Sequence, residues 1–570
     1  MCSPSMPPVK ADRQWVLPSD RAQTTALVCR CLLMVCIAVG GSLHLQAKQE
    51  PDDRTPEQIE DDETLWRYTV AMTTFLLAIL YGSQGPRWSF FYRIFGMGRP
   101  PRHYYRKTYI KRGYEPVAQA FASTLAEGRE TGMQFAAYVQ GELVVDLVGS
   151  MVERQGRDYT VNYDTVGHLL YDSDTYSTIW SSSKVITSIL MAWLVDQGHL
   201  DYQAKIVEYW PEFTGGGKEH VTVEQLLKHN AGLAIAPPFV MELEHLFPEN
   251  LPNGNASQVL ESMTCWKPPQ WTKWLSYHGI TRGWILNEIA RRVDPQKRTL
   301  GVILREEFTE KLNISSECYL GLPEKLNDPD RNPKLRLMDP CPPYLWVICN
   351  KLCQLLRIPS TVQWRFYLIH TACVTYAKLH WMPATDFVNP KFIGGYQMTS
   401  DPDFRRGETP SANVQATARA VATIANAMAT RNPNIFKAGN ETTTKAGLNE
   451  ESRHLMPMIL DIDHWAKATF NDGGFCVLAP PAPDNPDKLV KTHIPSLPGF
   501  SYAWGWFGFN GSLTAFHPEG DFAVVFQPTA FNDLDPTARV EKMTRALREC
   551  GRRLHGDDWG EYHDASVPMY

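Results

Sequence analysis

The chain lacks the features expected of a nucleic-acid-binding or metal-binding protein. Its 56 Lys and Arg are outweighed by 62 Asp and Glu, so no overall basic excess is available to attract a phosphate backbone. None of its 12 cysteines forms a C-x-x-C pair, and the close cysteine pairs with histidines that zinc sites need are missing. It also lacks internal repeats and low-complexity tracts. We therefore expect no nucleic acid, no metal and no cofactor, in a chain of ordinary globular composition with 44% hydrophobic residues.

The first 114 residues are expected to form a membrane-associated or targeting region. Residues 26–45 are an apolar run of twenty residues with a single charge, at Arg30. A run of that length spans a bilayer as an anchor, or serves as the apolar core of a signal peptide. Residues 69–81 form a shorter apolar run, which suits a short tilted span, an interfacial helix or a core helix.

A basic stretch with interleaved aromatic residues, 87–112, follows the two runs and suits an anionic membrane surface. If both runs span the bilayer, the positive-inside rule places the rest of the chain on the cytoplasmic side. Glycosylation sequons point instead to a secretory lumen. They begin at Asn255, Asn313, Asn440 and Asn510. We predict membrane association with the side of the membrane open.

From Glu115 to Tyr570 the chain has the pattern of a single folded domain with strands at both ends. The expected strands cover 133–139, 142–148, 502–507, 512–517 and 522–528, and the expected helices cover 183–197, 222–229, 412–429 and 536–554. Sequential hairpins favour antiparallel pairing. We predict an α/β (α+β) fold with a mainly antiparallel central sheet built from both chain ends, flanked by helices, with an all-helical middle region.

An apolar, aromatic insertion at about 327–389 interrupts this pattern. It suits a lid, a second membrane contact or an extra core layer, and ordinary core helices explain it equally well.

Ser181 and Lys184 form the S-x-x-K pattern of this chain, at the start of a helical run. Residues three apart lie on the same face of a helix, so the lysine side chain reaches the serine hydroxyl. A serine hydroxyl is a poor nucleophile until a neighbouring group takes its proton. The start of a helix also favours the negative charge that develops there. Ser181 is therefore the candidate nucleophile.

Residues 177–233 resemble the serine β-lactamase-related family, which includes class C β-lactamases, family VIII carboxylesterases, penicillin-binding proteins and the β-lactamase-domain-containing proteins of animals. In that family the S-x-x-K helix is followed by a G-x-L-x-L-x-x-x-V segment, a W-P motif and a T-V-x-x-L-L-x-H-x-x-G-L helix. The counterparts here are 198–207, Trp210-Pro211 and 222–233. The resemblance extends from about Glu115 to Leu554 and implies a serine hydrolase of this fold.

The second family motif matches Tyr277-His278-Gly279. The resemblance makes Tyr277 the partner of Lys184 in moving the Ser181 proton, and places Gly279 among the substrate-binding residues. We expect the lysine ammonium to lower the pKa of the Tyr277 hydroxyl. His229 and His278 are interpreted as structural residues rather than as bases.

The third family motif matches Trp506-Phe507-Gly508, which the resemblance assigns to substrate binding. It also implies an oxyanion hole made by the backbone N–H groups of Ser181 and Phe509. Trp506 stands where β-lactamases carry a lysine, so the cation that holds an antibiotic carboxylate is missing.

The resemblance therefore implies a serine hydrolase that acts through an acyl-enzyme on an ester or small amide. Two alternatives stay open: a non-catalytic or self-associating scaffold that keeps the fold, and a serine peptidase that uses the same residues.

Overall fold

A computed structural model of the chain describes residues 103–126, 130, 132–155, 158–162, 175–234, 241–265, 277–327, 336–337, 401–437, 453–457, 465–478, 497–508, 510–531 and 536–561. The chain divides into two compact units, 1–100 and 101–570, and the description concerns the second. The apolar runs 26–45 and 69–81 lie outside the described residues, as does most of the 327–389 insertion. Membrane association therefore stays a prediction. No helix in the described ranges is long and apolar enough to cross a bilayer.

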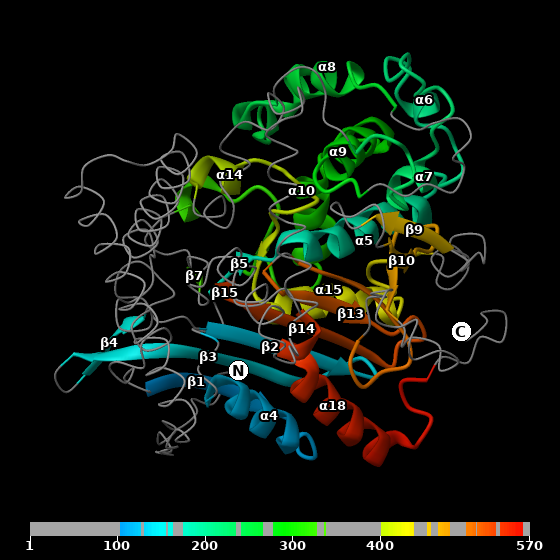
Figure 1. Cartoon of the computed structure of the whole chain (residues 1–570). Coiled ribbons are helices and arrows are strands. Elements are labelled where there is room, and N and C mark those ends of the chain that lie inside the picture. The colour runs from blue at the N-terminus through cyan, green and yellow to red at the C-terminus, as the bar shows by residue number, and fades with distance from the viewer. Residues whose placement is uncertain are drawn as a thin grey trace, which may run out of the picture. The chain divides into compact units, whose positions relative to one another are not determined.

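The centre of the domain is an eight-stranded antiparallel sheet whose strands come from both ends of the domain (Figure 1). Its strands are β1 (His103–Ile110), β2 (Gly132–Val139), β3 (Glu142–Gln155), β4 (Asp158–Asn162), β11 (Cys476–Leu478), β12 (Ala503–Phe507), β13 (Leu513–Phe516) and β14 (Phe522–Pro528). The order is β1-β3-β2-β14-β13-β12-β11, with β4 paired to β3. β2 pairs with β14, which joins the two chain ends in the middle of the sheet. The predicted fold class is confirmed.

The sheet begins earlier in the chain than expected. β1 lies before Glu115, where the domain was predicted to start, and pairs antiparallel with β3 along its whole length. Part of the basic, aromatic stretch 87–112 is therefore an edge strand. Basic residues on an edge strand hinder its pairing with another chain.

Alternating residues of each central strand contribute to the hydrophobic cores on the two faces of the sheet. In β14, Phe522, Val524 and Phe526 face the core shared with helices α4 (Glu115–Ala126) and α18 (Pro536–His555). Ala523 and Val525 belong to the other core, which contains helices α5 (Ser183–Asp196) and α15 (Ala418–Ala429). Figure 1 shows α4 and α18 on one side of the sheet, and α5 and α15 on the other. This arrangement follows from the two-residue period of a strand.

The middle of the chain is mainly helical and packs beyond α5. Its α-helices are α6 (Ile206–Tyr209), α7 (Val223–Leu227), α8 (Asn255–Glu261), α9 (Thr281–Val293), α10 (Leu300–Ile303) and α14 (Pro402–Arg406). It also has a π-helix, η4 (Leu304–Thr309), and the 3-10 helices η2 (Leu243–Leu246), η3 (Leu251–Asn253) and η5 (Glu324–Leu326). The small sheets are β5 (Ser177–Thr178), β8 (Gln415–Ala416) and β6 (Cys318–Tyr319); β9 (Arg453–Pro457) and β10 (Trp465–Thr469); and β7 (Arg336–Leu337) with β15 (Ala530–Phe531).

The helix expected at 412–429 begins later, as α15 at Ala418. Thr417 ends the preceding extended segment, and its side chain accepts a hydrogen bond from the Ala420 N–H, as an N-cap residue does. The residues before it lie in β8, which pairs with β5. The alanine-rich composition alone did not reveal this boundary.

The sequon at Asn510 is buried, with an exposed fraction of 2%, and its side-chain amide donates to the carbonyl of Pro528. It is therefore not accessible to glycosylation in the folded domain, and gives no support to a luminal location.

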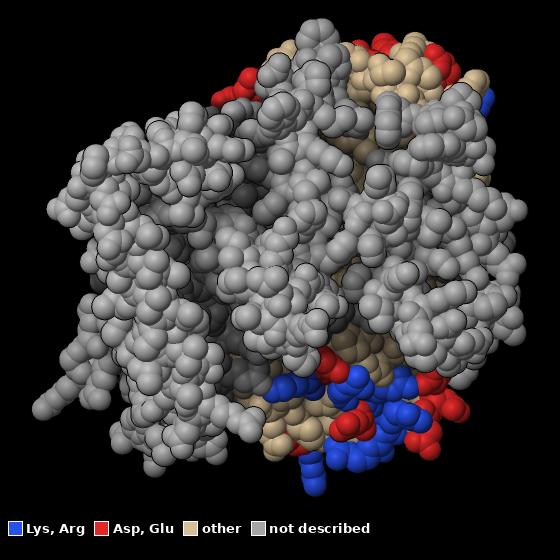
Figure 2. All heavy atoms as spheres, viewed as in Figure 1, with Lys and Arg blue, Asp and Glu red and all other residues tan. Residues whose placement is uncertain are grey.

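Figure 2 shows acidic and basic side chains intermixed at the end of the domain where α4 and α18 lie. Ion pairs join several of them, including Arg545 with Glu541 and Arg548 with Glu561.

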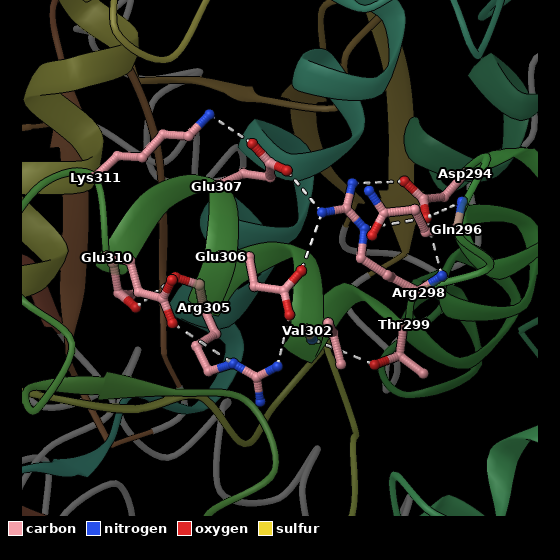
Figure 3. A network of polar contacts seen from close by, with 11 residues as sticks. Asp294, Gln296, Arg298, Thr299, Val302, Arg305, Glu306, Glu307, Glu310 and Lys311 are labelled. Carbon is pink, nitrogen blue, oxygen red and sulfur yellow. Dashed lines mark hydrogen bonds and ion pairs between the residues drawn. The ribbon is translucent and has the colours of Figure 1, made fainter.

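Arg298 is the centre of an ion-pair network between the end of α9 and η4 (Figure 3). Its guanidinium donates to Asp294 at 2.8 and 3.1 Å, to Glu307 at 2.6 Å and to Glu306 at 3.1 Å. The Asp294 side chain is fully buried and that of Arg298 is 10% exposed. Arg305 belongs to the same network, but its side chain is 55% exposed.

Glu408 is a buried carboxylate that has no cationic partner among the described residues. It accepts hydrogen bonds from Thr299 Oγ1 at 2.7 Å, Asn287 Nδ2 at 2.9 Å and the Gly301 N–H at 3.3 Å. Desolvation is the main reason that the pKa of Glu408 is raised to about 7, against the opposing effect of these hydrogen bonds.

Replacing Arg298 by methionine should destabilise the domain by about 3 kcal/mol, because it leaves the buried Asp294 carboxylate without its cation. The matched variant Arg305→Met removes an exposed cation from the same network and should cost less than about 1 kcal/mol. Denaturant unfolding of both variants measures the difference. Equal decreases in the free energy of unfolding of the two variants would show that burial does not decide the strength of this network.

Glu408→Gln should change the pH dependence of stability. Because the folded carboxyl has the higher pKa, its contribution is fully present below the unfolded pKa and is lost as the pH rises through about 7. The amide does not titrate, so the variant does not lose this contribution. The free energy of unfolding of the variant, minus that of the wild type, should therefore be about 2 to 4 kcal/mol higher above pH 7 than at low pH. A difference in unfolding free energy between the two proteins that is the same at all pH values would contradict this assignment.

Candidate active site

The candidate nucleophile lies in a short turn between the sheet and α5. Ser181 belongs to η1 (Trp180–Ser182), two residues before α5 begins, and not to the first turn of the α-helix as expected. Trp180 has a φ of 49°, a left-handed conformation that costs a non-glycine residue about 1–3 kcal/mol and is often found at functional sites. Ser181 is partly exposed, whereas Ser182 and Ser183 are buried. Of the three consecutive serines, Ser181 is therefore the one that a substrate could reach from solvent.

Lys184 is buried, and its amine is surrounded by oxygen atoms. The Nζ atom donates to the carbonyl oxygen of Gly279 at 2.8 Å and to that of Ser411 at 2.9 Å. It lies 3.2 Å from the Oγ of Ser181. None of these three partners carries a negative charge. Desolvation lowers the pKa of Lys184 well below its ordinary value, and Arg282 lowers it further.

Tyr277 completes the group around the nucleophile. Its hydroxyl donates to Ser181 Oγ at 2.8 Å. Lys184 and Tyr277 therefore both lie within hydrogen-bonding distance of Ser181. The three residues predicted to carry the chemistry come from η1, α5 and the segment before α9.

The expected effect of Lys184 on Tyr277 was wrong. Desolvation raises the pKa of Tyr277, and hydrogen bonds with Ser181 and Trp506 offset it only in part. Lys184 Nζ lies over the aromatic ring, 4.9 Å from its centre. Since the lysine is itself buried and tends to be neutral, it does not stabilise a phenolate.

His229 and His278 hold the Tyr277 segment in place. The backbone N–H of His278 donates to Nδ1 of His229 at 3.0 Å, and Nε2 of His278 accepts from the Leu233 N–H at 2.8 Å. Desolvation is the main reason that the pKa of His229 lies well below its ordinary value. Both rings are buried and used in backbone contacts, in agreement with a structural role.

The third motif packs against the nucleophile turn. A Cβ at Gly508 would lie 2.1 Å from Ser512 Oγ and 2.7 Å from the Ile179 carbonyl oxygen, so only glycine fits. Ser182 Oγ lies 3.2 Å from the carbonyl oxygens of both Trp506 and Ser512. The glycine was predicted to admit substrate; here it admits the turn that carries Ser181.

Trp506 lies beside the candidate triad in a group of aromatic rings. Its ring is stacked on that of Tyr277 with centroids 5.8 Å apart, and lies 5.5 Å from that of Phe470. Trp506 and Phe507 are partly exposed, as substrate-contacting residues would be. Phe509, the predicted second oxyanion donor, lies outside the described residues, so the oxyanion hole of Ser181 and Phe509 stays a prediction.

Sequence reasoning missed the carbonyl groups that hold Lys184. Gly279 was predicted to contact substrate, but its carbonyl oxygen accepts from the lysine. Ser411 had no predicted role, although its motif Pro410-Ser-Ala-Asn413 was recognisable. Its carbonyl holds Lys184, and its hydroxyl accepts from the Gly283 N–H at 2.8 Å. Any residue type has a backbone carbonyl, so the sequence does not show which carbonyl groups bind Lys184. The motif was the only signal in the sequence that pointed to this segment.

No cluster of three or more His, Cys, Asp or Glu suited to a metal ion occurs in the described ranges.

Comparison with known proteins identifies the family. The Beta-lactamase family model matches residues 117–549. The chain is similar to LipL, an esterase/beta-lactamase of Mycobacterium tuberculosis, with 29% identity over 209 residues, which make up 36% of this chain and 43% of that protein. The chain thus matches less than half the length of this curated relative.

Solved structures show the same fold. A penicillin-binding-protein homologue from Caulobacter crescentus is 24% identical with a TM-score of 0.53, covering 78% of this chain and 100% of its own. EstA from Arthrobacter nitroguajacolicus is 23% identical with a TM-score of 0.55, covering 79% and 100%. A family VIII carboxylesterase is 22% identical with a TM-score of 0.53, covering 78% and 100%. Since the family model spans well over half of the sequence, this chain belongs to the Beta-lactamase family.

Proposed function

We propose that this protein is a serine hydrolase that forms an acyl-enzyme on Ser181 with an ester or small amide substrate. The observation that carries the proposal is the position of Ser181 Oγ, partly exposed and within hydrogen-bonding distance of both Lys184 and Tyr277. A nucleophile in reach of a base and a second proton carrier is the arrangement that acyl transfer requires. The likeness to proteins described as esterases favours an ester.

Lys184 is the proposed base in the first step. A neutral amine has two N–H groups and one lone pair, and the two N–H groups are directed to the carbonyl oxygens of Gly279 and Ser411. The lone pair then faces Ser181 and takes its proton as Oγ bonds to the substrate carbonyl carbon. The carbonyl π electrons move to its oxygen, which gives a tetrahedral intermediate.

Tyr277 is the proposed acid in the second step. The intermediate collapses, the bond to the leaving group breaks, and the leaving oxygen or nitrogen takes the phenolic proton. Lys184 returns a proton to Tyr277 as it regains its neutral form. Water then attacks the acyl-enzyme, loses its proton to the same groups, and releases the acid and free Ser181.

The residues around Ser181 favour an apolar acyl group. Trp506 stacks on Tyr277, and Phe470 lies against both Trp506 and His229. Tyr277 and Trp506 are partly exposed, so the described surface beside Ser181 is aromatic. We infer a preference for uncharged acyl groups over the carboxylate-bearing rings of penicillins.

Ser181→Ala should abolish covalent labelling by a fluorophosphonate probe, because the nucleophilic oxygen is removed. The matched variant Ser182→Ala removes the adjacent hydroxyl, which is buried and bonded to backbone carbonyls, and should still be labelled. Mass spectrometry of the intact proteins measures the adduct. Labelling that survives in Ser181→Ala would exclude Ser181 as the nucleophile, and a wild type that is inert to the probe would support the non-catalytic scaffold instead.

Lys184→Arg should reduce turnover of an aryl ester by a factor on the order of 100 to 10,000, because a guanidinium stays protonated and cannot act as a base. In the wild type, kcat/KM should rise with pH through a midpoint well below the ordinary pKa of lysine, since the amine must be neutral to take the proton. An initial-rate pH profile measures both. Full activity in Lys184→Arg would exclude the lysine as the base.

A further inference from the structure

Arg282 is a fully buried cation close to the proposed catalytic residues. It is the second residue of α9 and lies five positions after Tyr277, with an exposed fraction of 0%. Its Nη2 donates to Ser188 Oγ at 2.7 Å and its Nε to the Leu227 carbonyl oxygen at 3.2 Å. Nη2 also lies 3.5 Å from the Gly474 carbonyl oxygen. Arg282 thus connects four segments of the helical region.

The charge of Arg282 is not neutralised by a direct partner. It forms no ion pair with any carboxylate in the described residues, and its Nη1 has no hydrogen-bond partner there. A buried guanidinium is normally paired, because removing an unpaired charge from water is unfavourable. Arg539, another buried arginine of the described residues, is paired in this way, with two hydrogen bonds of 2.6 Å to Glu130. An unpaired buried cation that persists at an active site suggests a function for the charge.

The position of Arg282 relative to α5 indicates which group feels that charge. Ser188 lies one helical turn after Lys184, so the two side chains are on the same face of α5. Leu227, the other strong contact, lies two residues before His229. The two hydrogen-bond partners of the guanidinium therefore lie one helical turn from Lys184 and two residues from His229, in a region where burial keeps charges from being screened.

We propose that Arg282 is a positioning residue whose buried, unpaired charge keeps Lys184 uncharged and therefore able to accept the Ser181 proton. This inference rests on the proposed function, because Ser181 reactivity is its readout. The charge acts by repulsion: a second cation close by makes protonation of the lysine less favourable. The direction of the Lys184 and His229 pKa values, both lowered by Arg282 after desolvation, supports this.

The remaining titratable groups around Lys184 and Arg282 do not replace this effect. From the segment before α9 come Tyr277 and the buried His278, and from the segment before α6 comes Tyr202. Desolvation raises the pKa of both tyrosines. The acidic groups Glu224 and Asp472 form ion pairs with Lys228, which balances them locally. Only tyrosines, and no carboxylate, act noticeably on Arg282.

The competing explanation is that Arg282 only joins segments through hydrogen bonds. Three variants separate charge from hydrogen bonding. Arg282→Gln removes the charge and keeps a polar amide, Arg282→Lys keeps the charge, and Ser188→Ala removes the shortest hydrogen bond of Arg282 but leaves its charge. Circular dichroism and thermal unfolding establish that each variant is folded.

The measurement is the rate of Ser181 modification by a fluorophosphonate from about pH 5 to about pH 10, followed by fluorescence. In this reaction Ser181 Oγ bonds to phosphorus, fluoride leaves, and Lys184 takes the serine proton. On the acid side of the wild-type profile, Arg282→Gln should react roughly three- to ten-fold more slowly, because more of its lysine is protonated, and the two rates should converge at alkaline pH. Arg282→Lys and Ser188→Ala should follow the wild-type profile.

Equal slowing of Arg282→Gln and Arg282→Lys at every pH would overturn the proposal in favour of a purely structural role. A wild-type profile that rises only near the ordinary lysine pKa of about 10.4 would overturn it without any variant, and so covers the case in which Arg282→Gln fails to fold. A wild type that is not labelled at any pH would refute the proposed function itself, which distinguishes the two failures.

Discussion

The site depends on one constraint, the burial of the Lys184 amine among groups that carry no negative charge. Two backbone carbonyls, of Gly279 and Ser411, occupy its N–H groups, and the third neighbour is the hydroxyl of Ser181. In water a lysine would be protonated and useless as a base; here desolvation favours the neutral amine. The energetic cost of this arrangement is met by the surrounding fold, whose elements bring the two carbonyls to the lysine.

The antiparallel sheet and the helical region each supply part of that arrangement. Gly508 and Ser512 at the end of the β12–β13 hairpin pack against the carbonyl of Ile179, which fixes the turn before α5. On the other side, α9 begins just after Tyr277, and its Gly283 N–H donates to Ser411. The site is therefore assembled at the contact between the sheet and the helices, and neither part forms it alone.

The sequence predicted the architecture well where periodicity and turns are local. The strand expected at 133–139 is β2 at Gly132–Val139, and the final helix expected at 536–554 is α18 at Pro536–His555. The strand expected at 142–148 continues as β3 to Gln155. Ser181, Lys184 and Tyr277 were identified through family motifs, and the structure brings them together. What could not be predicted depends on three-dimensional packing: the edge strand β1, the carbonyl partners of Lys184, the raised pKa of Tyr277 and the unpaired charge of Arg282.

The central claim is that Ser181 carries the acyl group during turnover. The most direct test is rapid acid quenching of the protein during hydrolysis of a p-nitrophenyl ester of a short fatty acid, followed by mass spectrometry of the intact chain and its peptides. The account predicts a transient mass increase equal to the acyl group, located on Ser181. Hydrolysis by the purified protein with no acyl adduct on Ser181, or with the adduct on another residue, would contradict it.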